Sequence, residues 1–508
     1  MKIKHKHHSK EGIKINSTQV SKGDFMKIAI VGCGISGANA LKTIIDHKNF
    51  SENIHIDIFE KRNELGVGPA YEDDDMHKVL NTPVEHMNLN LENRDEFKNW
   101  LIEKYGKLPT VEGKIPRPIV GLYIKEKYKK YFAHKNVSIH QNEMVDVIKE
   151  NDKFILKSKN ESYGPYNEVF LSIGQSYYKD DYNLNEYENY VSNPYPLREK
   201  ITNINKNDTL GIIGTGPSSI DIYRYLSKYF DYRKPLYFFT NSSFFALPEI
   251  KEYCPKNICS FDEAWISNHQ DEDGFIKLDD FKETFDNDFK KACVDFYATY
   301  EYYKDNDIEV SRKALKSKDF NLEFCQSYAL ELWYVSTSLF NSLNGLEQIE
   351  FKKSYQTKIE YLMTKTPFIT MENIFSDLDK GKIKIVKDTE DISYINGKFE
   401  ITTKNKESFS TDKIFNAQGF EKDLSKAIKK DNLLENLYKN RLIDADLNDN
   451  INVAYPSYNP ITTKYGQIKN LHINGMWTAS VDISNNDLRS VLISSKDMAN
   501  NFMNNLEN

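Results

Sequence analysis

Three closely spaced glycines near the start of the chain have the spacing of a phosphate-binding turn. Gly32, Gly34 and Gly37 form G-x-G-x-x-G between the short apolar run "KIAIV" and the helical pattern "ANALKTII". In such a series the first glycine permits a tight turn, the second lets the backbone approach a pyrophosphate, and the third lets helix and strand pack closely. The phosphate then meets the positive end of the helix dipole. The alternative is a turn whose glycines serve packing only.

An acidic residue at the end of the next apolar run supports a nucleotide at this turn. The run "IHIDIFE" predicts a second strand that ends at Glu60. A carboxylate in that place accepts hydrogen bonds from the ribose hydroxyls of a dinucleotide. We add Ser36, at the start of the helix, and Lys61, next to Glu60, to the candidate binding residues. The motif by itself does not distinguish one dinucleotide from another.

The segment that follows suits a loop close to a ligand. Gly68 lies in "LGVGPAY", and Asn81, Met87 and Asn88 lie in and just after "LNTPVEHM". Glycine permits close backbone approach, and the two amides with the apolar methionine could lie against a flat ring.

The same glycine pattern recurs about 180 residues later. In "LGIIGTGPSS" Gly214 and Gly216 take the places of the motif's first two glycines, and Ser219 replaces the third with another small residue. Pro217 stands at the start of the predicted helix, where its missing N–H is least costly. We therefore expect a second phosphate-binding turn, with Ser218 also among its residues.

The strand after the second turn, "PLYFFTNSS", has no acidic residue near Thr240. A carboxylate there would favour a free ribose 2′-hydroxyl, whereas its absence tolerates a 2′-phosphate and favours NADPH over NADH. The residues available to meet that phosphate are Arg233, Lys234, Ser242 and Ser243. Arg233 and Lys234 are explained equally well as solvent-exposed residues just before the strand.

Two further strand patterns end in a glycine and indicate how the chain is divided. "YNEVFLSIGQS" reaches Gly174 before the second turn, and "TDKIFNAQGF" reaches Gly419 after it. In flavoproteins with two dinucleotide sites, such strands carry the chain between the two folds. We therefore predict an α/β protein of two Rossmann-like folds, the second inserted into the first.

The expected boundaries follow from these patterns. Residues 26–204 and 400–508 form the discontinuous first domain, and 205–399 form the second. Residues 1–25 are expected to be a disordered leader or tag. Residues from about 260 to 350 are expected to be a helical cap, whose regularly spaced aromatic residues serve core packing or line a substrate cavity.

The chain resembles a bacterial family of FAD/NAD(P)-binding proteins, which is similar in layout to class B flavin monooxygenases and amine N-hydroxylases. The resemblance rests on "GVGPAY" at 66–71, "LNTPVEHM" at 80–87, "FKNWL" at 97–101 and "PRPIVGLYIKEKY" at 116–128. It implies FAD in the first fold, with Glu60 on the adenosine ribose, and NAD(P)H in the second.

The resemblance extends loosely to the C-terminus. The pattern "LHING" predicts a strand that reaches Gly475, and an amphipathic helix follows an acidic-x-Arg start at Asp487 to Arg489. Flavoproteins of this layout place the N-terminus of such a helix near the pyrimidine end of the flavin ring, where its dipole stabilises negative charge.

Composition excludes several other functions. The net charge is −7, so no basic field is available for nucleic acid, and no apolar run is long enough to span a membrane. The five cysteines are scattered, which is typical of a cytoplasmic protein with reduced thiols. Cys254 and Cys259 have the C-x4-C spacing of a redox dithiol, and they are the alternative site. No metal-binding spacing is present.

We therefore expect an FAD-dependent NAD(P)H oxidoreductase, monooxygenase-like and acting on a small molecule. The alternatives are a flavin reductase or dehydrogenase without oxygen transfer, and a non-catalytic flavin or NAD(P) sensor. The sequence identifies no catalytic residue and leaves the oligomeric state open.

Overall fold

The structure is a computed structural model, and its described residues are 25–175, 177–241, 244–250, 258–483 and 486–507. The predicted leader up to residue 24, the phosphate candidates Ser242 and Ser243, and Cys254 lie outside the described residues.

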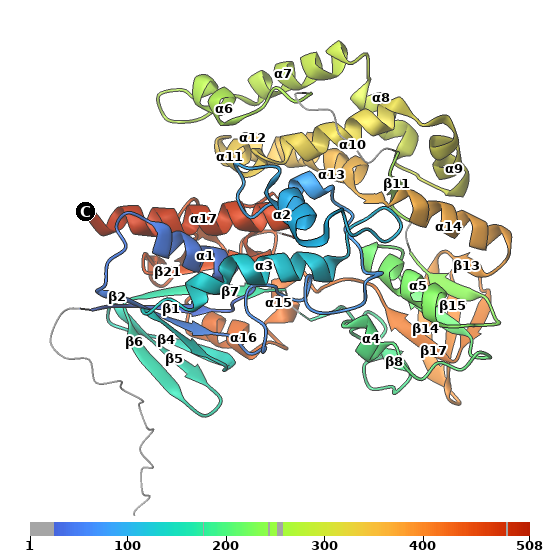
Figure 1. The fold of residues 1–508 in the computed structure, drawn as a ribbon, viewed down its shortest axis with the longest axis horizontal. Coiled ribbons are helices and arrows are strands. Elements are labelled where there is room, and N and C mark those ends of the chain that lie inside the picture. The colour runs from blue at the N-terminus through green and yellow to red at the C-terminus, as the bar shows by residue number, and fades with distance from the viewer. Residues whose placement is uncertain (1–24, 176, 242–243, 251–257, 484–485, 508) are drawn as a thin grey trace, which may run out of the picture.

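The first glycine turn belongs to a five-stranded parallel sheet of order β3-β2-β1-β7-β21. Helices lie over one face, and a three-stranded antiparallel sheet lies against the other (Figure 1). The strands are short apolar runs because both faces of the sheet are covered. The parallel strands are β1 Met26–Val31, β2 Ile54–Phe59, β3 Val137–His140, β7 Glu168–Gly174 and β21 Leu471–Gly475. The covering elements are α1 Ile35–Asp46, α3 Arg117–Phe132, α17 Leu488–Asn504, β4 Met144–Glu150, β5 Lys153–Ser158 and β6 Ser162–Tyr166.

The second glycine turn belongs to another five-stranded parallel sheet, of order β13-β10-β9-β17-β8. Its strands are β8 Tyr190–Val191, β9 Leu210–Ile213, β10 Leu236–Phe239, β13 Ile383–Val386 and β17 Lys413–Asn416. Helices α5 (Pro217–Tyr229) and α14 (Phe368–Asp379) belong to this part of the chain. A second antiparallel sheet follows β13 and consists of β14 Thr389–Ile395, β15 Lys398–Thr403 and β16 Ser408–Thr411.

The two sheets repeat one chain path: strand, glycine turn, helix, two more parallel strands, a three-stranded antiparallel sheet and a return strand. The whole second sheet lies in the sequence between β7 and β21 of the first. The predicted α/β fold class, with one Rossmann-like fold inserted into another, is therefore confirmed.

The strand pairing moves the predicted limits of the second fold. β17 pairs with β9, so the strand at 413–416 belongs to the second sheet and not to the first, as a boundary at 399 would require. β8 lies before residue 205 and pairs with β17. Both strands are too short to mark a boundary by sequence pattern alone.

The helical cap lies between β11 (Leu247–Pro248) and β12 (Lys365–Thr366), and it extends beyond the predicted 350 to Met363. The segment from Met371 to Asp379 forms part of α14, and its apolar residues recur at helical spacing. The cap helices are α6 Glu263–His269, α7 Leu278–Lys291, α8 Phe296–Tyr303, α9 Ile308–Ser317, α10 Phe320–Leu332, α11 Ser336–Asn341, α12 Gly345–Phe351 and α13 Thr357–Met363. None of the helices in the described ranges is both long and apolar enough to cross a membrane.

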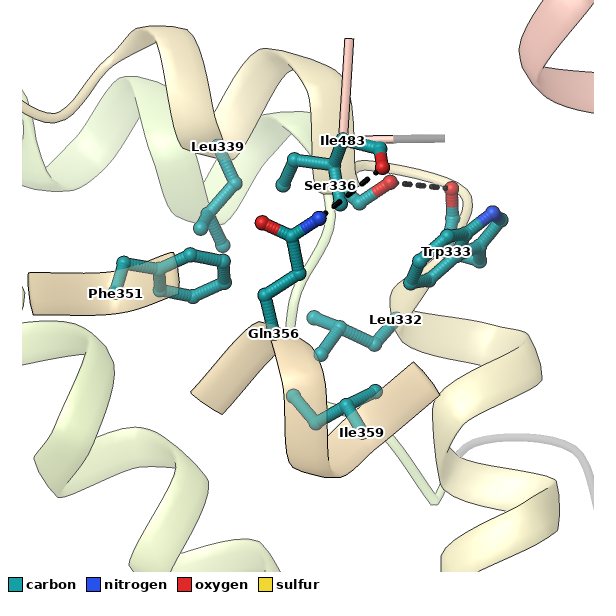
Figure 2. Close-up of a pocket in the computed structure, with 8 residues that line it drawn as sticks. All are labelled: Leu332, Trp333, Ser336, Leu339, Phe351, Gln356, Ile359 and Ile483. Carbon is teal, nitrogen blue, oxygen red and sulfur yellow. Dashed lines mark hydrogen bonds between the residues drawn. The ribbon is translucent and has the colours of Figure 1, made fainter. Parts of the chain in front are cut away.

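A small apolar pocket lies inside the cap (Figure 2). Gln356, in a π-helical turn, points into it and donates a hydrogen bond to the Ile483 carbonyl at 3.2 Å. The pocket has a volume of about 10 Å³, enough for one water molecule, so it is too small for an organic substrate.

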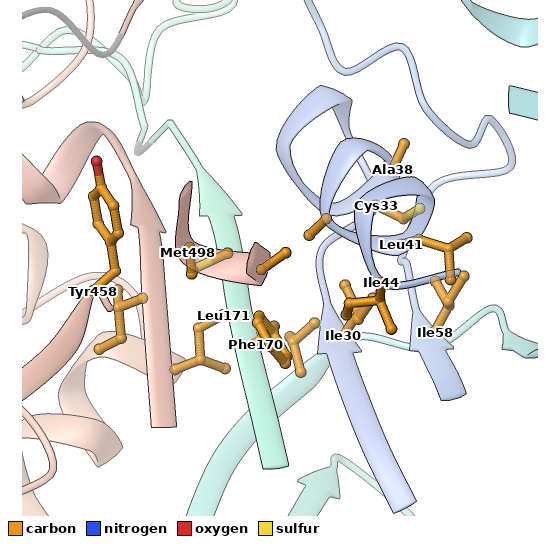
Figure 3. Close-up of a cluster of buried hydrophobic side chains, with 14 of the residues drawn as sticks. Ile30, Cys33, Ala38, Leu41, Ile44, Ile58, Phe170, Leu171, Tyr458 and Met498 are labelled. Atoms are coloured by element: carbon orange, nitrogen blue, oxygen red, sulfur yellow. The ribbon is translucent and has the colours of Figure 1, made fainter. Parts of the chain in front are cut away.

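The apolar core of the first fold joins both ends of the chain. Figure 3 shows Leu41 and Ile44 of α1 over the strand that carries Ile30, and Met498 of α17 beside Phe170 of β7. All five side chains are fully buried. Burying each of them contributes about 1.5–3 kcal/mol, so the C-terminal helix is an integral part of the first fold.

Candidate cofactor-binding site

The first and third glycines of the first turn are required by packing. Gly32 has φ +84°, and a Cβ there would lie 2.2 Å from the Ser172 carbonyl oxygen on β7. A Cβ on Gly37 would lie 2.1 Å from the Gly32 carbonyl oxygen. These glycines allow α1 and the return strand to close on the turn.

Gly34 differs, because nothing in the described structure requires a glycine there. Its φ is −73°, and the atom nearest to a built Cβ is the Cα of Gly68 at 3.6 Å, an ordinary van der Waals distance. The Arg62 guanidinium is 4.0 Å from a Cβ built on either glycine. Gly34, Gly68 and Arg62 thus come together at the N-terminus of α1, where N–H groups and a guanidinium are suited to a pyrophosphate.

Glu60 is fixed beside this space. Its carboxylate is 5% exposed and accepts hydrogen bonds from the backbone N–H of Cys33 at 2.8 Å and of Arg62 at 3.0 Å. Ser36 donates to Asn474 at 2.8 Å and so connects α1 with β21. Lys61 instead points to the surface, where it pairs with Glu143 at 2.9 Å. Sequence reasoning missed Arg62, although its position two residues after Glu60 was a usable signal.

The loop after Gly68 is held by its own amide groups. The Asn88 side chain donates to the carbonyls of Glu85 and Arg94 and accepts from the Phe97 N–H. Its hydrogen-bonding capacity is thus used inside the protein, and its role here is to shape the loop. Asn81 is half-buried, and Met87 belongs to the apolar core.

Gly174 and Gly475 meet at the edge of the sheet where the first turn lies. The two residues pair in the β7–β21 register. A Cβ on Gly475 would lie 3.4 Å from the Gly174 nitrogen, so the two strand ends approach closely. This brings both predicted glycines to the same edge as Gly32 and Gly34.

The second turn repeats the design of the first. Gly214 has φ +107°, and a Cβ there would lie 2.6 Å from the Ala417 carbonyl oxygen of the return strand. Gly216 has φ −81° and no atom within 4 Å of a built Cβ. Ser219 is fully buried and donates to the Gly216 carbonyl at 2.7 Å.

The remaining residues of the second site divide between the two ends of the sheet. Ser218 is half-buried in the first turn of α5, and Gly419 follows β17 at the same sheet edge. Arg233 and Lys234 precede β10 and therefore lie at the opposite edge, where Lys234 donates to Thr209 at 3.0 Å. These two residues lie at the N-terminal end of β10 and do not reach the sheet edge where the glycine turn lies.

Buried charges connect the two folds. Arg117, at the start of α3, donates to Asp221 of α5 at 2.8 Å, and Tyr195 donates to the same carboxylate oxygen at 2.7 Å. Lys114 and Lys365 both pair with Glu249, at 2.8 Å and 3.0 Å. The sequence pattern "PRPIVG" included Arg117 but gave no sign of its partner.

The described cysteines do not form a dithiol site. Cys259 is half-buried and free, and burial raises the pKa of its thiol to about 12, so it is protonated and unreactive at neutral pH. Its proposed partner Cys254 lies outside the described residues.

Comparison with known proteins agrees with this geometry. Residues 29–176 match the family model described as FAD-NAD(P)-binding. No curated protein sequence matches the chain.

Several solved structures share the fold at low sequence identity. One is the reduced ornithine hydroxylase of Pseudomonas aeruginosa, with TM-score 0.60, 11% identity and coverage of 95% of this chain and 100% of that one. Another is the Kutzneria ornithine N-hydroxylase with reduced FAD, NADP+ and ornithine, with TM-score 0.55, 11% identity and coverage of 95% and 100%. A third is the bacillithiol disulfide reductase of Staphylococcus aureus, with TM-score 0.51, 12% identity and coverage of 95% and 99%. Residues 29–176 are thus similar to an FAD-NAD(P)-binding domain, and the chain shares the fold of these two ornithine hydroxylases.

Proposed function

We propose that this protein is an FAD-dependent oxidoreductase that uses NADPH in preference to NADH and transfers oxygen to a small molecule. The observation that carries the proposal is the pair of open glycines, Gly34 and Gly216. Each sits at a helix N-terminus, in ordinary extended backbone, where an alanine would cause no clash within the protein; close approach of a phosphate is therefore the reason we give for the glycine.

In this proposal the first turn holds FAD and the second holds the nicotinamide cofactor. Glu60 accepts from the adenosine ribose, Arg62 neutralises pyrophosphate charge, and the α1 dipole adds to that field. FAD bound there supplies hydride acceptance and electron transfer to oxygen. The residues proposed for FAD are Gly32, Gly34, Ser36, Gly37, Glu60, Arg62, Gly68, Asn81, Met87, Gly174 and Gly475, and those for NADPH are Gly214, Gly216, Ser218, Ser219 and Gly419.

Substituting the open glycines separates the two cofactor sites. Gly34→Ala places a methyl in the first phosphate space without a clash in the protein, and we expect it to weaken FAD binding roughly tenfold or more. Gly216→Ala should retain FAD and raise the KM for NADPH by about the same factor. Visible flavin absorbance and NADPH oxidation measure the two effects. If both variants lose the same cofactor, or neither loses any, the assignment is wrong.

Oxygen use separates the proposed monooxygenase from a reductase. NADPH oxidation by the FAD-loaded protein should require oxygen. With labelled oxygen, one labelled atom should appear in the product. Rapid anaerobic oxidation of NADPH with a disulfide as acceptor would instead indicate a reductase, which the fold also accommodates. A protein that holds FAD but shows no turnover under either condition would be a sensor.

A further inference from the structure

The first turn of α17 meets the cap and the loop of the 3-10 helix η1 (Val84–His86) in one cluster, formed by the buried residues Arg489 and His86 and the half-buried residues Tyr334 and Arg94. The Arg489 guanidinium carbon is 3.8 Å from the centre of the Tyr334 ring, and that of Arg94 is 4.2 Å from it. The Tyr334 hydroxyl is 3.0 Å from Nδ1 of His86. Three distant parts of the chain thus bring two cations to one aromatic ring.

The two arginines differ in how their charge is balanced. Nη1 of Arg94 donates to both carboxylate oxygens of Glu331, each at 3.0 Å. Arg489 is only 4% exposed, yet it has no carboxylate within ion-pair distance in the described part of the chain. Burying a charge without a partner of opposite charge is unfavourable, so this arrangement favours an anionic ligand.

One edge of the Arg489 guanidinium has no hydrogen-bond partner among the described residues. Nη1 donates to the Leu330 carbonyl at 3.1 Å and lies 3.3 Å from Nδ1 of His86. Nε is buried and has no hydrogen-bond partner among the described residues. The edge formed by Nε and Nη2 is the one that binds a carboxylate through two parallel hydrogen bonds.

The surroundings of the cluster favour an anion. Burial, and then the charges of Arg489, Arg94 and Lys365, lower the pKa of His86 to about 3. The imidazole is therefore neutral at pH 7, and its Nδ1 accepts from Arg489. Among the charges that affect this imidazole most, three are cations, and Asp487 is the carboxylate that opposes them.

A purely structural role for Arg489 is the main alternative, because its guanidinium stacks on Tyr334 and donates to the Leu330 carbonyl. A structural role leaves the unpartnered Nε and the unbalanced charge of the guanidinium unexplained. We propose that Arg489 is the anchor for a carboxylate of the small-molecule substrate, at the junction of cap and first fold. This inference rests on the proposed function, and it assigns an anionic class of substrate to it.

The test uses FAD-loaded protein and two probes that differ only in charge, propionate and propionamide. Propionate should raise the melting temperature saturably at constant ionic strength, and propionamide should not. Arg489→Met should weaken the apparent Kd for propionate about tenfold or more, as expected for losing a charge-assisted bond. Arg489→Lys should give an intermediate value, since it retains the charge but not the planar fork.

Arg312→Met is the matched control. Arg312 also stacks on an aromatic ring, at 4.4 Å from Phe375, but it is paired with Asp379 at 2.7 Å. Its loss should leave the propionate response unchanged.

Three results would overturn the inference: no propionate response in the unsubstituted protein, an equal response in Arg489→Met, or loss of FAD from that variant. If Arg489→Met does not fold, an unchanged propionate Kd in Arg489→Lys has the same meaning. The proposed function fails on separate measurements, FAD content and NADPH oxidation, so the two failures are distinguishable.

Discussion

Asp482 is a buried carboxyl group whose hydrogen bonds fit its protonated form. It is 2% exposed, and it lies 2.7 Å from the Tyr458 hydroxyl and 2.8 Å from the Thr478 hydroxyl. Thr478 also donates to the Gly475 carbonyl at 2.8 Å, and a hydroxyl has one proton to give. A proton on Asp482 satisfies all three groups. Burial accordingly raises the pKa of Asp482 to about 7.

Stability should therefore fall with rising pH. The folded protein holds this proton up to about pH 7, whereas an unfolded aspartate loses it near its ordinary pKa of 3.8, so unfolding releases a proton between these values. The loss across that window is on the order of 4 kcal/mol. Asp482→Asn keeps the hydrogen bonds without the charge, and we expect it to be more stable than the unsubstituted protein at pH 8. Urea unfolding at pH 5 and pH 8 measures the free energy of unfolding of both proteins. The prediction is contradicted if this free energy changes with pH by the same amount in Asp482→Asn and in the unsubstituted protein.

At the scale of elements, close packing explains a glycine inside a helix. Gly121 lies in the second turn of α3, where alanine would ordinarily stabilise the helix by about 1 kcal/mol. A Cβ there would lie 2.0 Å from the Tyr71 carbonyl oxygen. The helix thus rests directly on the backbone of the loop that follows Gly68.

Gly121→Ala should destabilise the protein by about 1–3 kcal/mol, because the overpacking exceeds the gain in helix propensity. Gly345→Ala is the control, since Gly345 begins α12 and has no atom within 4 Å of a built Cβ. We expect that substitution to be neutral or to stabilise by up to about 1 kcal/mol. Denaturant unfolding compares the two, and equal effects would show that α3 can move away from Tyr71.

At the scale of the whole molecule, the Arg117–Asp221 pair fixes one fold against the other. Asp221 is 3% exposed and receives both Arg117 and Tyr195. Asp221→Asn leaves the buried Arg117 charge uncompensated, so we expect a loss of about 3–5 kcal/mol in unfolding free energy. A double-mutant cycle with Arg117→Met measures the coupling. The surface pair Arg312–Asp379 is the control, and Asp379→Asn should change stability by less than about 1 kcal/mol. Additive effects of the two buried substitutions would contradict the prediction.

Much of the fold could be predicted from the sequence because the patterns that indicate it involve neighbouring residues. The turn glycines and the apolar strands each depend on neighbouring residues, and the structure has them as predicted. The predicted boundary at 399 differs from the strand pairing because β17 is four residues long and its sheet is chosen by pairing with β9.

The sequence by itself determined two phosphate turns and an inserted second fold, because backbone conformation and hydrophobic period are properties of adjacent residues. Tertiary structure alone decided which glycines are required by packing and which are open, since that depends on carbonyls of Ser172 and Ala417 far along the chain. It also decided that Arg233 and Lys234 face the wrong edge of their sheet. The charge on Arg489 lies unpaired beside Tyr334 for the same reason: electrostatic balance in a buried site is set by residues that only folding brings together.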